Sequence, residues 1–400
     1  MDQPDFDTSV VVVGAGQAGL SVAYYLRRLG LDPGNDFVLL DRGPGTGGAW
    51  QYRWEALRIG YAHRINDLPG MDELGLSFET ADRQAPAKQV VADYYARYEE
   101  HFGFQVVRPA DVTLVTPELD GVKVDFEIDL PDEQTGSPDD RPAPRGLFGR
   151  RRDPEPEPEP DPAAATRTLR APVLVNATGT WGAPFIPYYP GMNDFRGRHV
   201  HTVEYENAEA FRGQRVVVVG GGTSAIGFLL ELEEVAAELT WVSRRPIEFL
   251  DGQEYDIEGS AQAVALQDEA AREGRVLPSV VSTTGVPRSR RIQAAIDRGL
   301  LVARPVFQSI VPHGVRWSNG FVLPADAIIW ATGFRPELRH LAPLKLREKA
   351  GGVIVGGGAS WRNPRVFFAG YGPTASTSGA NKVGRTIARQ VVATLSAMGR

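Results

Sequence analysis

Two glycine-rich stretches, about 200 residues apart, are the parts of this chain whose residue types and spacing could do chemistry. The first, Gly14–Gly19 (G-A-G-Q-A-G), follows the valine run Val10–Val13. The second, Gly220–Ala225 (G-G-G-T-S-A), follows Val216–Val219. A glycine turn between a buried strand and a helix presents backbone N–H groups at the positive end of the helix dipole, where a pyrophosphate binds. Two such turns predict two dinucleotides in one protein, and therefore a redox enzyme that passes a hydride between carriers.

Each glycine in the first turn has its own physical reason. Gly14 allows the tight turn, Gly16 lets a phosphate approach the backbone, and Gly19 lets helix and strand pack closely. In the second turn Ala225 takes the third position as a tolerated small residue. The residues predicted to hold the phosphates are Gly14, Gly16, Gln17, Ala18 and Gly19 in the first turn, and Gly220, Gly222, Thr223 and Ser224 in the second.

The residue at the end of the next strand separates the two sites. After the first turn it is Asp41, followed by Arg42, and a carboxylate there can accept both ribose hydroxyls of FAD or NAD. After the second turn the strand runs into Ser243-Arg244-Arg245, with no acid. Guanidinium groups pair with phosphate in a two-pronged manner, so this site is expected to prefer the 2′-phosphate of NADPH. A solvated basic turn is the alternative interpretation of the two arginines.

The elements around these turns predict an α/β fold with two Rossmann-like dinucleotide-binding domains. Apolar spacing predicts helices over 17–30 and 88–103, and alternation from Val122 to Ile128 predicts strands of a small β-meander. Nearly equal strands end in Ala177-Thr178-Gly179 and Ala331-Thr332-Gly333, which suggests that the NADPH-binding domain (190–324) is inserted in the FAD-binding domain (1–185 and 325–400).

Composition excludes several classes of function. The net charge of −7 gives no general attraction to nucleic acid or acidic membranes, and no apolar run reaches the ~20 residues of a membrane span. The chain has no cysteine, so it cannot carry the dithiol of a disulfide reductase. No metal site is predicted, and the acidic N-terminus lacks a signal-peptide pattern, so a cytoplasmic location is expected.

Residues 131–165 change composition sharply, with an Arg150-Arg151-Arg152 cluster and a Pro-Glu repeat. Such a segment cannot bury enough apolar surface to offset its ordering entropy, so a disordered or extended surface loop is predicted.

Phe195 to Tyr205 fits F-x-G-x-x-x-H-x-x-x-Y in full and resembles the fingerprint of the class B flavin-dependent monooxygenases. Gly47-Gly48-Ala49-Trp50 is similar to the G-G-x-W of that family, and the two Ala-Thr-Gly stretches are similar to its linkers. Phe367 to Gly372 resembles its flavin-contacting strand and turn. The resemblance implies FAD and NADPH as cofactors, with further cofactor contacts from Gly48, Trp50, Thr178, Gly179, Thr332, Gly333 and Gly370.

The resemblance also implies a mechanism: NADPH reduces FAD, O2 adds to give a C4a-hydroperoxyflavin, and a soft nucleophile of a small-molecule substrate takes one oxygen. Baeyer–Villiger members usually have Trp where this chain has Tyr205, so oxygenation at N or S is expected. Some members place an Asn near the flavin ring, and here Tyr61 falls nearest, with Asn66 a few residues on. Tyr61, Asn66 and His201 are the catalytic candidates, although a histidine in a linker strand is more often structural.

Two other functions fit the same motifs. One is an NADPH oxidase or reductase that passes electrons to another acceptor. The other is a flavoprotein without enzymatic activity, whose cofactor occupancy a partner senses through residues 131–165. The protein is expected to be a monomer or a homodimer.

Overall fold

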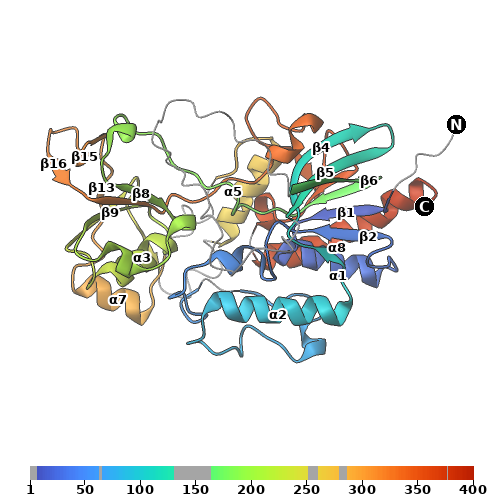
Figure 1. The fold of residues 1–400 in the computed structure, drawn as a ribbon, viewed down its shortest axis with the longest axis horizontal. Helices are drawn as coiled ribbons and strands as arrows, with labels where there is room; N and C mark the ends of the chain where they lie inside the picture. The colour runs from blue at the N-terminus through green and yellow to red at the C-terminus, as the bar shows by residue number, and fades with distance from the viewer. Residues whose placement is uncertain (1–6, 63–64, 130–163, 251–259, 279–285, 376) are drawn as a thin grey trace.

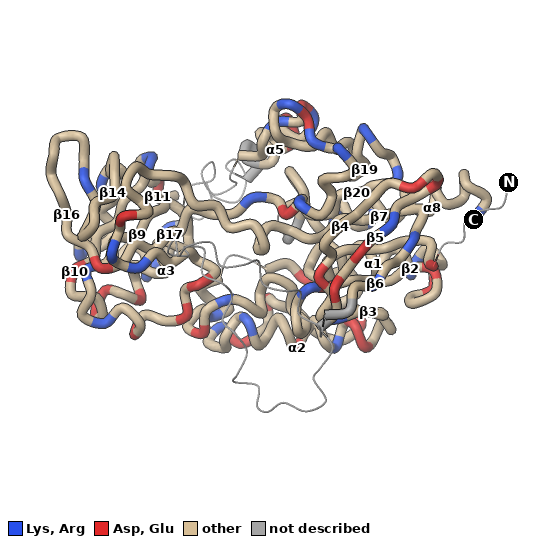
Figure 2. Tube along the Cα trace, turned by 45° about the horizontal axis from the view of Figure 1, so that its top comes forward, with Lys and Arg blue, Asp and Glu red and all other residues tan. Residues whose placement is uncertain are grey.

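The structure is a computed structural model that describes residues 7–62, 65–129, 164–250, 260–278, 286–375 and 377–400. Figure 1 shows two lobes side by side, each built on its own parallel sheet. The lobe that contains the C-terminus is called the first lobe, and the other the second lobe. Lysine, arginine, aspartate and glutamate are interspersed along both lobes (Figure 2).

The first lobe has a seven-stranded sheet in the order β18-β19-β20-β7-β1-β2-β3. Its strands β1, β2, β3, β7 and β20 run parallel, and β18 and β19 add an antiparallel edge. The strands are β1 (Val10–Val13), β2 (Phe37–Leu40), β3 (Val106–Val107), β7 (Val173–Asn176), β18 (Val355–Gly356), β19 (Ala359–Ser360) and β20 (Val366–Phe368). The helices are α1 (Gln17–Arg28), α2 (Ala87–Phe102) and α8 (Thr377–Ala397).

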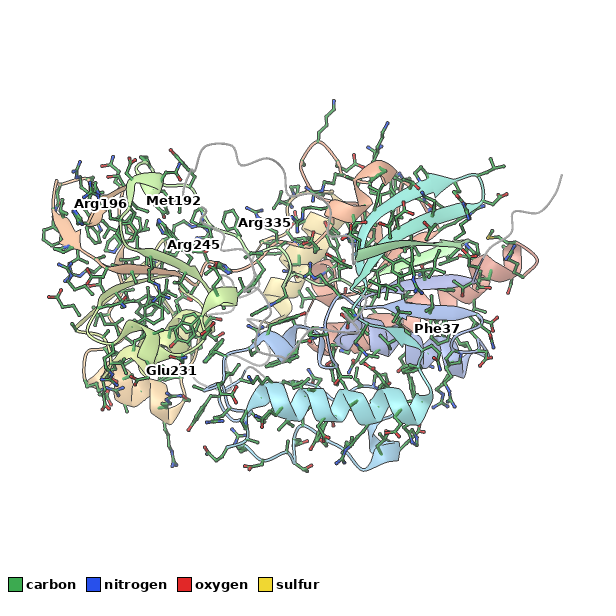
Figure 3. All side chains as sticks on the ribbon, in the orientation of Figure 1. Phe37, Met192, Arg196, Glu231, Arg245 and Arg335 are labelled. Atoms are coloured by element: carbon green, nitrogen blue, oxygen red, sulfur yellow. The ribbon has the colours of Figure 1, made fainter. Side chains whose placement is uncertain are left out.

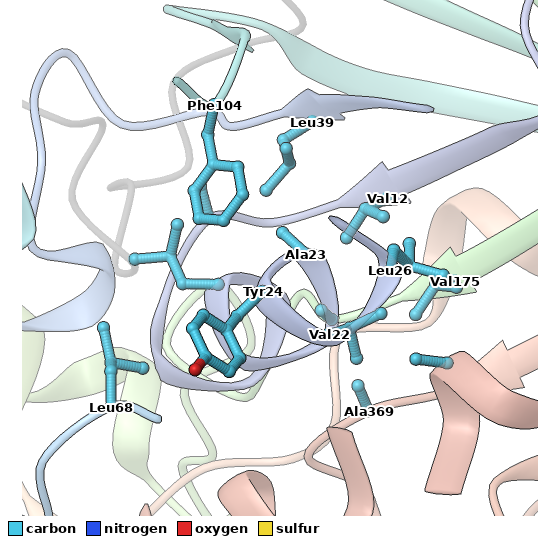
Figure 4. Packing of buried hydrophobic residues seen from close by; sticks show 14 of the residues in the cluster. Val12, Val22, Ala23, Tyr24, Leu26, Leu39, Leu68, Phe104, Val175 and Ala369 are labelled. Atoms are coloured by element: carbon cyan, nitrogen blue, oxygen red, sulfur yellow. The ribbon is translucent and has the colours of Figure 1, made fainter. Parts of the chain in front are cut away.

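The two faces of the first sheet are covered differently. Val10 and Val12 point into a core with α1, α2 and α8, and Figure 4 shows this packing around Tyr24 and Leu26. Val11 and Val13 point into a second core against a three-stranded antiparallel sheet, β4-β5-β6. A strand that is buried on both faces reads as continuous valine, as the β1 sequence does.

The three-stranded sheet confirms the predicted meander. Its strands are β4 (Asp111–Glu118), β5 (Gly121–Asp129) and β6 (Ala164–Ala171). Val122, Val124 and Phe126 are buried, as the alternation in the sequence predicted. The loop predicted over 131–165 lies outside the described residues except for its last two, which belong to β6.

The second lobe has a five-stranded parallel sheet in the order β13-β10-β9-β17-β8. Its strands are β8 (Arg198–His201), β9 (Arg215–Val219), β10 (Glu238–Ser243), β13 (Arg304–Pro305) and β17 (Ala327–Trp330). Helices α3 (Thr223–Leu232) and α7 (Arg290–Asp297) lie in this lobe, and α5 (Ser260–Arg272) lies between the lobes (Figure 1). Two parallel sheets, each with its glycine turn, confirm the predicted fold class.

Smaller elements complete the described chain. They are the strands β11 (Phe249–Leu250), β12 (Val286–Pro287), β14 (Ser309–Val311), β15 (Gly314–Arg316) and β16 (Val322–Pro324), and the short 3-10 helices η1 (Gly48–Tyr52), η2 (Met71–Leu74), η4 (Met192–Asp194), η5 (Thr202–Glu204), η6 (Ala208–Phe211), η8 (Arg339–Leu344) and η9 (Gly372–Thr374).

One predicted boundary is wrong. The chain was expected to return to the first domain at residue 325, but β17 pairs with β9 and β8 in the middle of the second sheet. The return therefore follows Trp330. The buried run Ala327–Trp330 fits either sheet by composition, because strand pairing depends on the tertiary fold and not on the run itself.

Candidate functional site

The first glycine turn joins β1 to α1 and is packed as its glycines predict. Gly14 has φ +104°, and a Cβ there would lie 2.5 Å from the carbonyl oxygen of Ala177. A Cβ on Gly19 would lie 1.8 Å from the carbonyl oxygen of Gly14. These two positions therefore require glycine for backbone conformation and for close packing.

Gly16 differs, because the protein itself leaves room beside it. Its φ is −87°, and a Cβ there would meet only the Cα of Gly48, at 3.7 Å. Gly16 is the N-cap of α1, and no side chain caps the helix. The first N–H groups of α1 are therefore available to an anion, which fits the pyrophosphate of a dinucleotide.

Asp41 follows β2 and lies beside this turn. Its carboxylate accepts the N–H of Ala15 at 3.3 Å and of Gly43 at 3.0 Å, and it lies 3.5 Å from Arg108. Arg108 in turn donates two hydrogen bonds to Glu99. The carboxylate is thus fixed at the edge of the sheet where a ribose would lie.

Arg42, predicted as a cofactor contact, has an exposed side chain that extends to the first strand-linking segment after β7. A Cβ built on Gly182 would meet its guanidinium, and its positive charge helps to lower the pKa of Glu337.

Gln17 is the centre of a hydrogen-bond network at the start of α1. Its amide nitrogen donates to the carbonyl of Asn66 (3.0 Å) and to the side chain of Asn381 (2.9 Å), and its oxygen accepts from Tyr95 (2.5 Å). The amide of Asn381 donates to the carbonyl of Asp67. The network therefore holds the residue 65–68 segment and the start of α8 against the first turn, and it includes Tyr95 and Asn381, which were not predicted as site residues.

Other residues predicted near FAD surround the same turn. Gly48 begins η1 opposite Gly16, and Trp50 is buried behind it. Gly370 has φ +76°, and a Cβ built there would lie 3.2 Å from the Cβ of Ala18. Tyr61 lies apart from this group: the residue is 54% exposed, and the guanidinium of Arg291 on α7 lies 4.6 Å from its ring centroid.

The second glycine turn repeats the first in the other lobe. Gly220 has φ +143°, and a Cβ there would lie 2.2 Å from the carbonyl oxygen of Ala331. Gly222 is the N-cap of α3, again without a side-chain cap, and Thr223 and Ser224 form the first turn of the helix. A Cβ on Gly221 would lie 3.0 Å from the hydroxyl oxygen of Ser243.

Ser243, Arg244 and Arg245 follow or end β10 in the second lobe, and the Ser243 hydroxyl lies beside the second turn. Ser243 is buried at the end of β10, while Arg244 and Arg245 are exposed. Figure 3 labels Arg245 in the second lobe and Arg335 between the lobes. Uncapped N–H groups, a hydroxyl and two guanidinium groups fit a phosphorylated dinucleotide.

The two Ala-Thr-Gly stretches form paired linkers between the lobes, named here the first linker (177–185) and the second linker (331–337). The N–H of Phe185 donates to Gly333, that of Arg335 to Ala183, and that of Glu337 to Gly179. Thr178 donates to the carbonyl of Glu337 at 2.8 Å and Thr332 to that of Phe185 at 2.5 Å. Both glycine turns abut these linkers, since Gly14 packs on Ala177 and Gly220 on Ala331.

His201 is fully buried at the end of β8, and both ring nitrogens are engaged. Nδ1 accepts the N–H of Val203, so Nε2 carries the proton and donates to Gly333 at 3.2 Å. Burial lowers the pKa of His201 to about 4. The imidazole is therefore neutral and fixes the fingerprint strand to the second linker, and this geometry does not support the predicted acid–base role.

Tyr205 ends the fingerprint and connects the lobes through a carboxylate that the sequence did not single out. Its hydroxyl donates to Oε2 of Glu231 on α3 (3.1 Å), and the indole N–H of Trp54 donates to Oε1 (2.7 Å). Trp54 comes from the first lobe but is buried in the core of the second. Burial raises the pKa of Glu231.

Paired parallel sheets with two uncapped glycine turns define a flavoprotein with two dinucleotide-binding folds. Residues 9–136 match the family described as FAD dependent oxidoreductase, and residues 163–265 match pyridine nucleotide-disulphide oxidoreductase. A solved flavin-containing monooxygenase from Stenotrophomonas maltophilia is 30% identical, with 96% of this chain and 98% of that chain covered and a TM-score of 0.71. The chain therefore belongs to the flavin monooxygenase family, and it is an oxidoreductase that uses FAD and NADPH for monooxygenation.

Two further relatives are more distant. A senecionine N-oxygenase from Tyria jacobaeae is 22% identical over 60% of this chain, and the match spans 47% of that protein. An indole-3-pyruvate monooxygenase from Oryza sativa subsp. japonica is 24% identical over 97% of this chain and 88% of that protein. Membership in the family implies a small-molecule substrate and O2.

The described residues contain neither a membrane-spanning helix nor a cluster of metal-binding side chains. No described helix has the length and apolar character that crossing a bilayer needs. No three His, Cys, Asp or Glu side chains among the described residues gather in a way that could hold a metal ion.

Proposed function

We propose that this enzyme oxygenates a nitrogen or sulfur atom of a small organic substrate, with FAD on the first glycine turn and NADPH on the second. The observation that carries the proposal is the contact of each turn with one of two mutually paired linkers. Because both turns follow the carboxyl ends of strands adjacent to the linker strands, both dinucleotides would extend toward the same junction.

FAD is held in this proposal by the backbone N–H groups at the start of α1, beside Gly16 and Gly48. The Asp41 carboxylate would accept the ribose hydroxyls, and Trp50, Thr178, Gly179 and Gly370 complete the site. The first lobe is then the FAD-binding domain.

NADPH is held by the start of α3 and by the end of β10. Gly220, Gly222, Thr223 and Ser224 would bind the pyrophosphate, and Ser243, Arg244 and Arg245 the 2′-phosphate. The second lobe, with β17 in its sheet, is then the NADPH-binding domain, and Thr332 and Gly333 lie where it meets the first.

When bound, the two cofactors supply electrons from nicotinamide to flavin and activate O2 for transfer of one atom. The chain's own contribution is to orient them and to limit water and proton donors at the junction. Trp181 stacks on Phe334 (5.0 Å between centroids), which places apolar rings where the linkers pair. His201 is neutral and its only ring proton is already donated to Gly333, so it offers no free acid to the reacting groups. Asn66 is held beside Gln17 and remains a candidate for contact with the flavin ring.

Two arguments favour nitrogen or sulfur as the atom oxygenated. One relative is named as an N-oxygenase. Tyr205 is the residue type of the N- and S-oxygenating branch, and here it is buried and fixed by Glu231. A cytoplasmic location and a monomeric or dimeric state complete the proposal.

A panel of one tertiary amine, one thioether and one ketone tests the proposal. With NADPH and ¹⁸O₂, the amine or the thioether should gain one labelled oxygen per NADPH consumed, measured by mass spectrometry. Ester formed from the ketone alone would mean Baeyer–Villiger chemistry. NADPH consumption that yields only hydrogen peroxide across the panel would favour the oxidase or reductase alternative.

A further inference from the structure

Arg53 is a half-buried cation with no acidic partner among the described residues. It follows η1 directly, in the segment that passes from the first lobe to the second. Its Nε is shielded from solvent and has no hydrogen-bond partner, and among the described residues no carboxylate lies within ion-pair distance of its guanidinium. Burial lowers the pKa of Arg53 to about 10.

Arg108 provides an internal comparison. Its side chain is 12% exposed and its Nε also has no partner, but its two terminal nitrogens donate to Glu99, at 2.6 and 2.7 Å, and the pKa of Arg108 is raised. The same fold therefore gives the guanidinium of Arg108 a carboxylate and leaves that of Arg53 without an anion among the described residues. Since a charge held partly out of water without a counter-ion is disfavoured, Arg53 is suited to pair with a negative group of a bound molecule.

Aromatic rings surround Arg53. Its guanidinium carbon lies 4.3 Å from the ring centroid of Trp181 and 5.4 Å from that of Trp50. Tyr52 lies parallel to Trp181, with 6.4 Å between centroids. Indole faces attract a cation but do not replace hydrogen-bond acceptors, so the in-plane N–H groups still need a partner.

The position of Arg53 is at the junction of the lobes. Trp50 belongs to the core of the first lobe and Trp54 to the core of the second, and Arg53 lies between them in sequence. Trp181 lies in the first linker and stacks on Phe334 of the second. This is the junction toward which both dinucleotides extend in the proposed function, on which the inference therefore rests.

We propose that Arg53 binds a carboxylate of the substrate, so that the substrates of this enzyme are organic acids with an apolar body that carries the oxidisable nitrogen or sulfur. The planar guanidinium can donate two parallel hydrogen bonds to a carboxylate. Trp50, Trp181 and Tyr52 supply the apolar surface for the rest of the molecule. The phosphates of FAD and NADPH are the other anions present, and the proposed cofactor sites already give each of them a helix N-terminus.

Binding of a matched pair of probes to the oxidised, FAD-loaded enzyme tests the inference without turnover. The probes are para-methylthiobenzoate and its neutral primary amide, and quenching of tryptophan fluorescence reports binding, because two indoles flank Arg53. The wild-type enzyme should bind the carboxylate at least ~10-fold more tightly than the amide, as expected for a charge-assisted pair. Arg53→Gln should remove this preference, and Arg53→Lys should keep part of it.

Arg316→Gln is the control variant, because it removes an exposed arginine on β15 in the second lobe, and it should behave as wild type.

Three results would overturn the inference. They are equal binding of the two probes by wild type, equal weakening of both probes by Arg53→Gln, and loss of FAD or NADPH affinity in Arg53→Gln with carboxylate binding unchanged. The last would assign Arg53 to a cofactor phosphate. Because these measurements need no oxygen transfer, their failure is distinct from failure of the proposed oxygenation, which is judged by labelled product.

Discussion

The Gly16→Val variant tests whether Gly16 is needed to bind FAD or to fold the first glycine turn. The backbone of Gly16 (φ −87°, ψ −165°) suits a β-branched residue, and its Cβ would be 3.7 Å from the nearest atom, the Cα of Gly48. The variant should therefore fold with a loss of ~1 kcal/mol or less, the scale of a changed N-cap residue. The side chain would instead fill the space of the pyrophosphate. Losing two charge-assisted hydrogen bonds costs ~3–6 kcal/mol, so FAD affinity should fall by roughly 10²–10⁴-fold.

Two other glycines calibrate the result. Gly14→Ala meets a carbonyl oxygen at 2.5 Å and keeps a left-handed φ of +104°, so it should destabilise the apoprotein by at least ~2 kcal/mol. Gly356→Val lies in open space at a sheet edge and should change neither property. The assay is the ratio of flavin to protein absorbance after purification, together with thermal unfolding of the apoproteins. A Gly16→Val protein that keeps its flavin as well as Gly356→Val does would refute the placement of FAD.

Three further changes test the rest of the site. Replacing Arg244 and Arg245 by Ala should weaken NADPH relative to NADH by ~1.5–3 kcal/mol in titrations, and equal losses would argue against a 2′-phosphate contact. Glu231→Gln leaves one buried donor unpaired, so stability should fall by ~1–3 kcal/mol and NADPH-driven flavin reduction should slow; unchanged values would argue against Glu231 as the link between Trp54 and Tyr205. Burial lowers the pKa of His201 from 6.5 to about 4. As pH falls, His201 is therefore protonated in the unfolded chain before it is protonated in the folded protein. The free energy of unfolding of the wild type should drop by up to ~3 kcal/mol between pH 6.5 and about pH 4. In pH-dependent denaturation, the His201→Gln variant should not show this drop in the free energy of unfolding. Its pH profile of kcat should keep the wild-type shape. If the variant loses one pH-dependent side of that profile, His201 acts as an acid or base.

The elements with strong local signals were predictable from the sequence. The helix expected over 17–30 is α1 (17–28), and the one expected over 88–103 is α2 (87–102), because their apolar residues recur with helical spacing. The valine runs and the alternation of β5 identified buried and half-buried strands for the same reason. Gly14 and Gly19 were also predictable, because a tight turn and a close helix contact leave few other residue types.

Contacts between distant parts of the chain were not predictable. Trp54 and Glu231 are 177 residues apart, and Gln17 and Asn381 are 364 apart. The sequence around each residue does not indicate its hydrogen-bond partner, because the contact forms only when the two lobes and the last helix pack together. The predicted domain boundary near β17 was wrong for a similar reason, because the sequence of an apolar strand does not indicate which sheet it joins.

Two residues show how burial alters a prediction made from residue type. His201 sits in a fingerprint and invited a chemical role, but its two nitrogens are used within the fold. Arg53 stands in a run of aromatic and basic residues, and only the structure shows that its charge has no acidic partner among the described residues. Side-chain partners, and not residue identities, decide both cases.

Anaerobic titration of the purified enzyme with NADPH tests the central claim most directly, because it asks whether the two dinucleotide sites exchange electrons. We expect a yellow protein with one FAD per chain whose flavin absorbance is lost on addition of one equivalent of NADPH, and more slowly with NADH. A protein that takes up no FAD, or whose bound flavin keeps its absorbance with NADPH present, would contradict it.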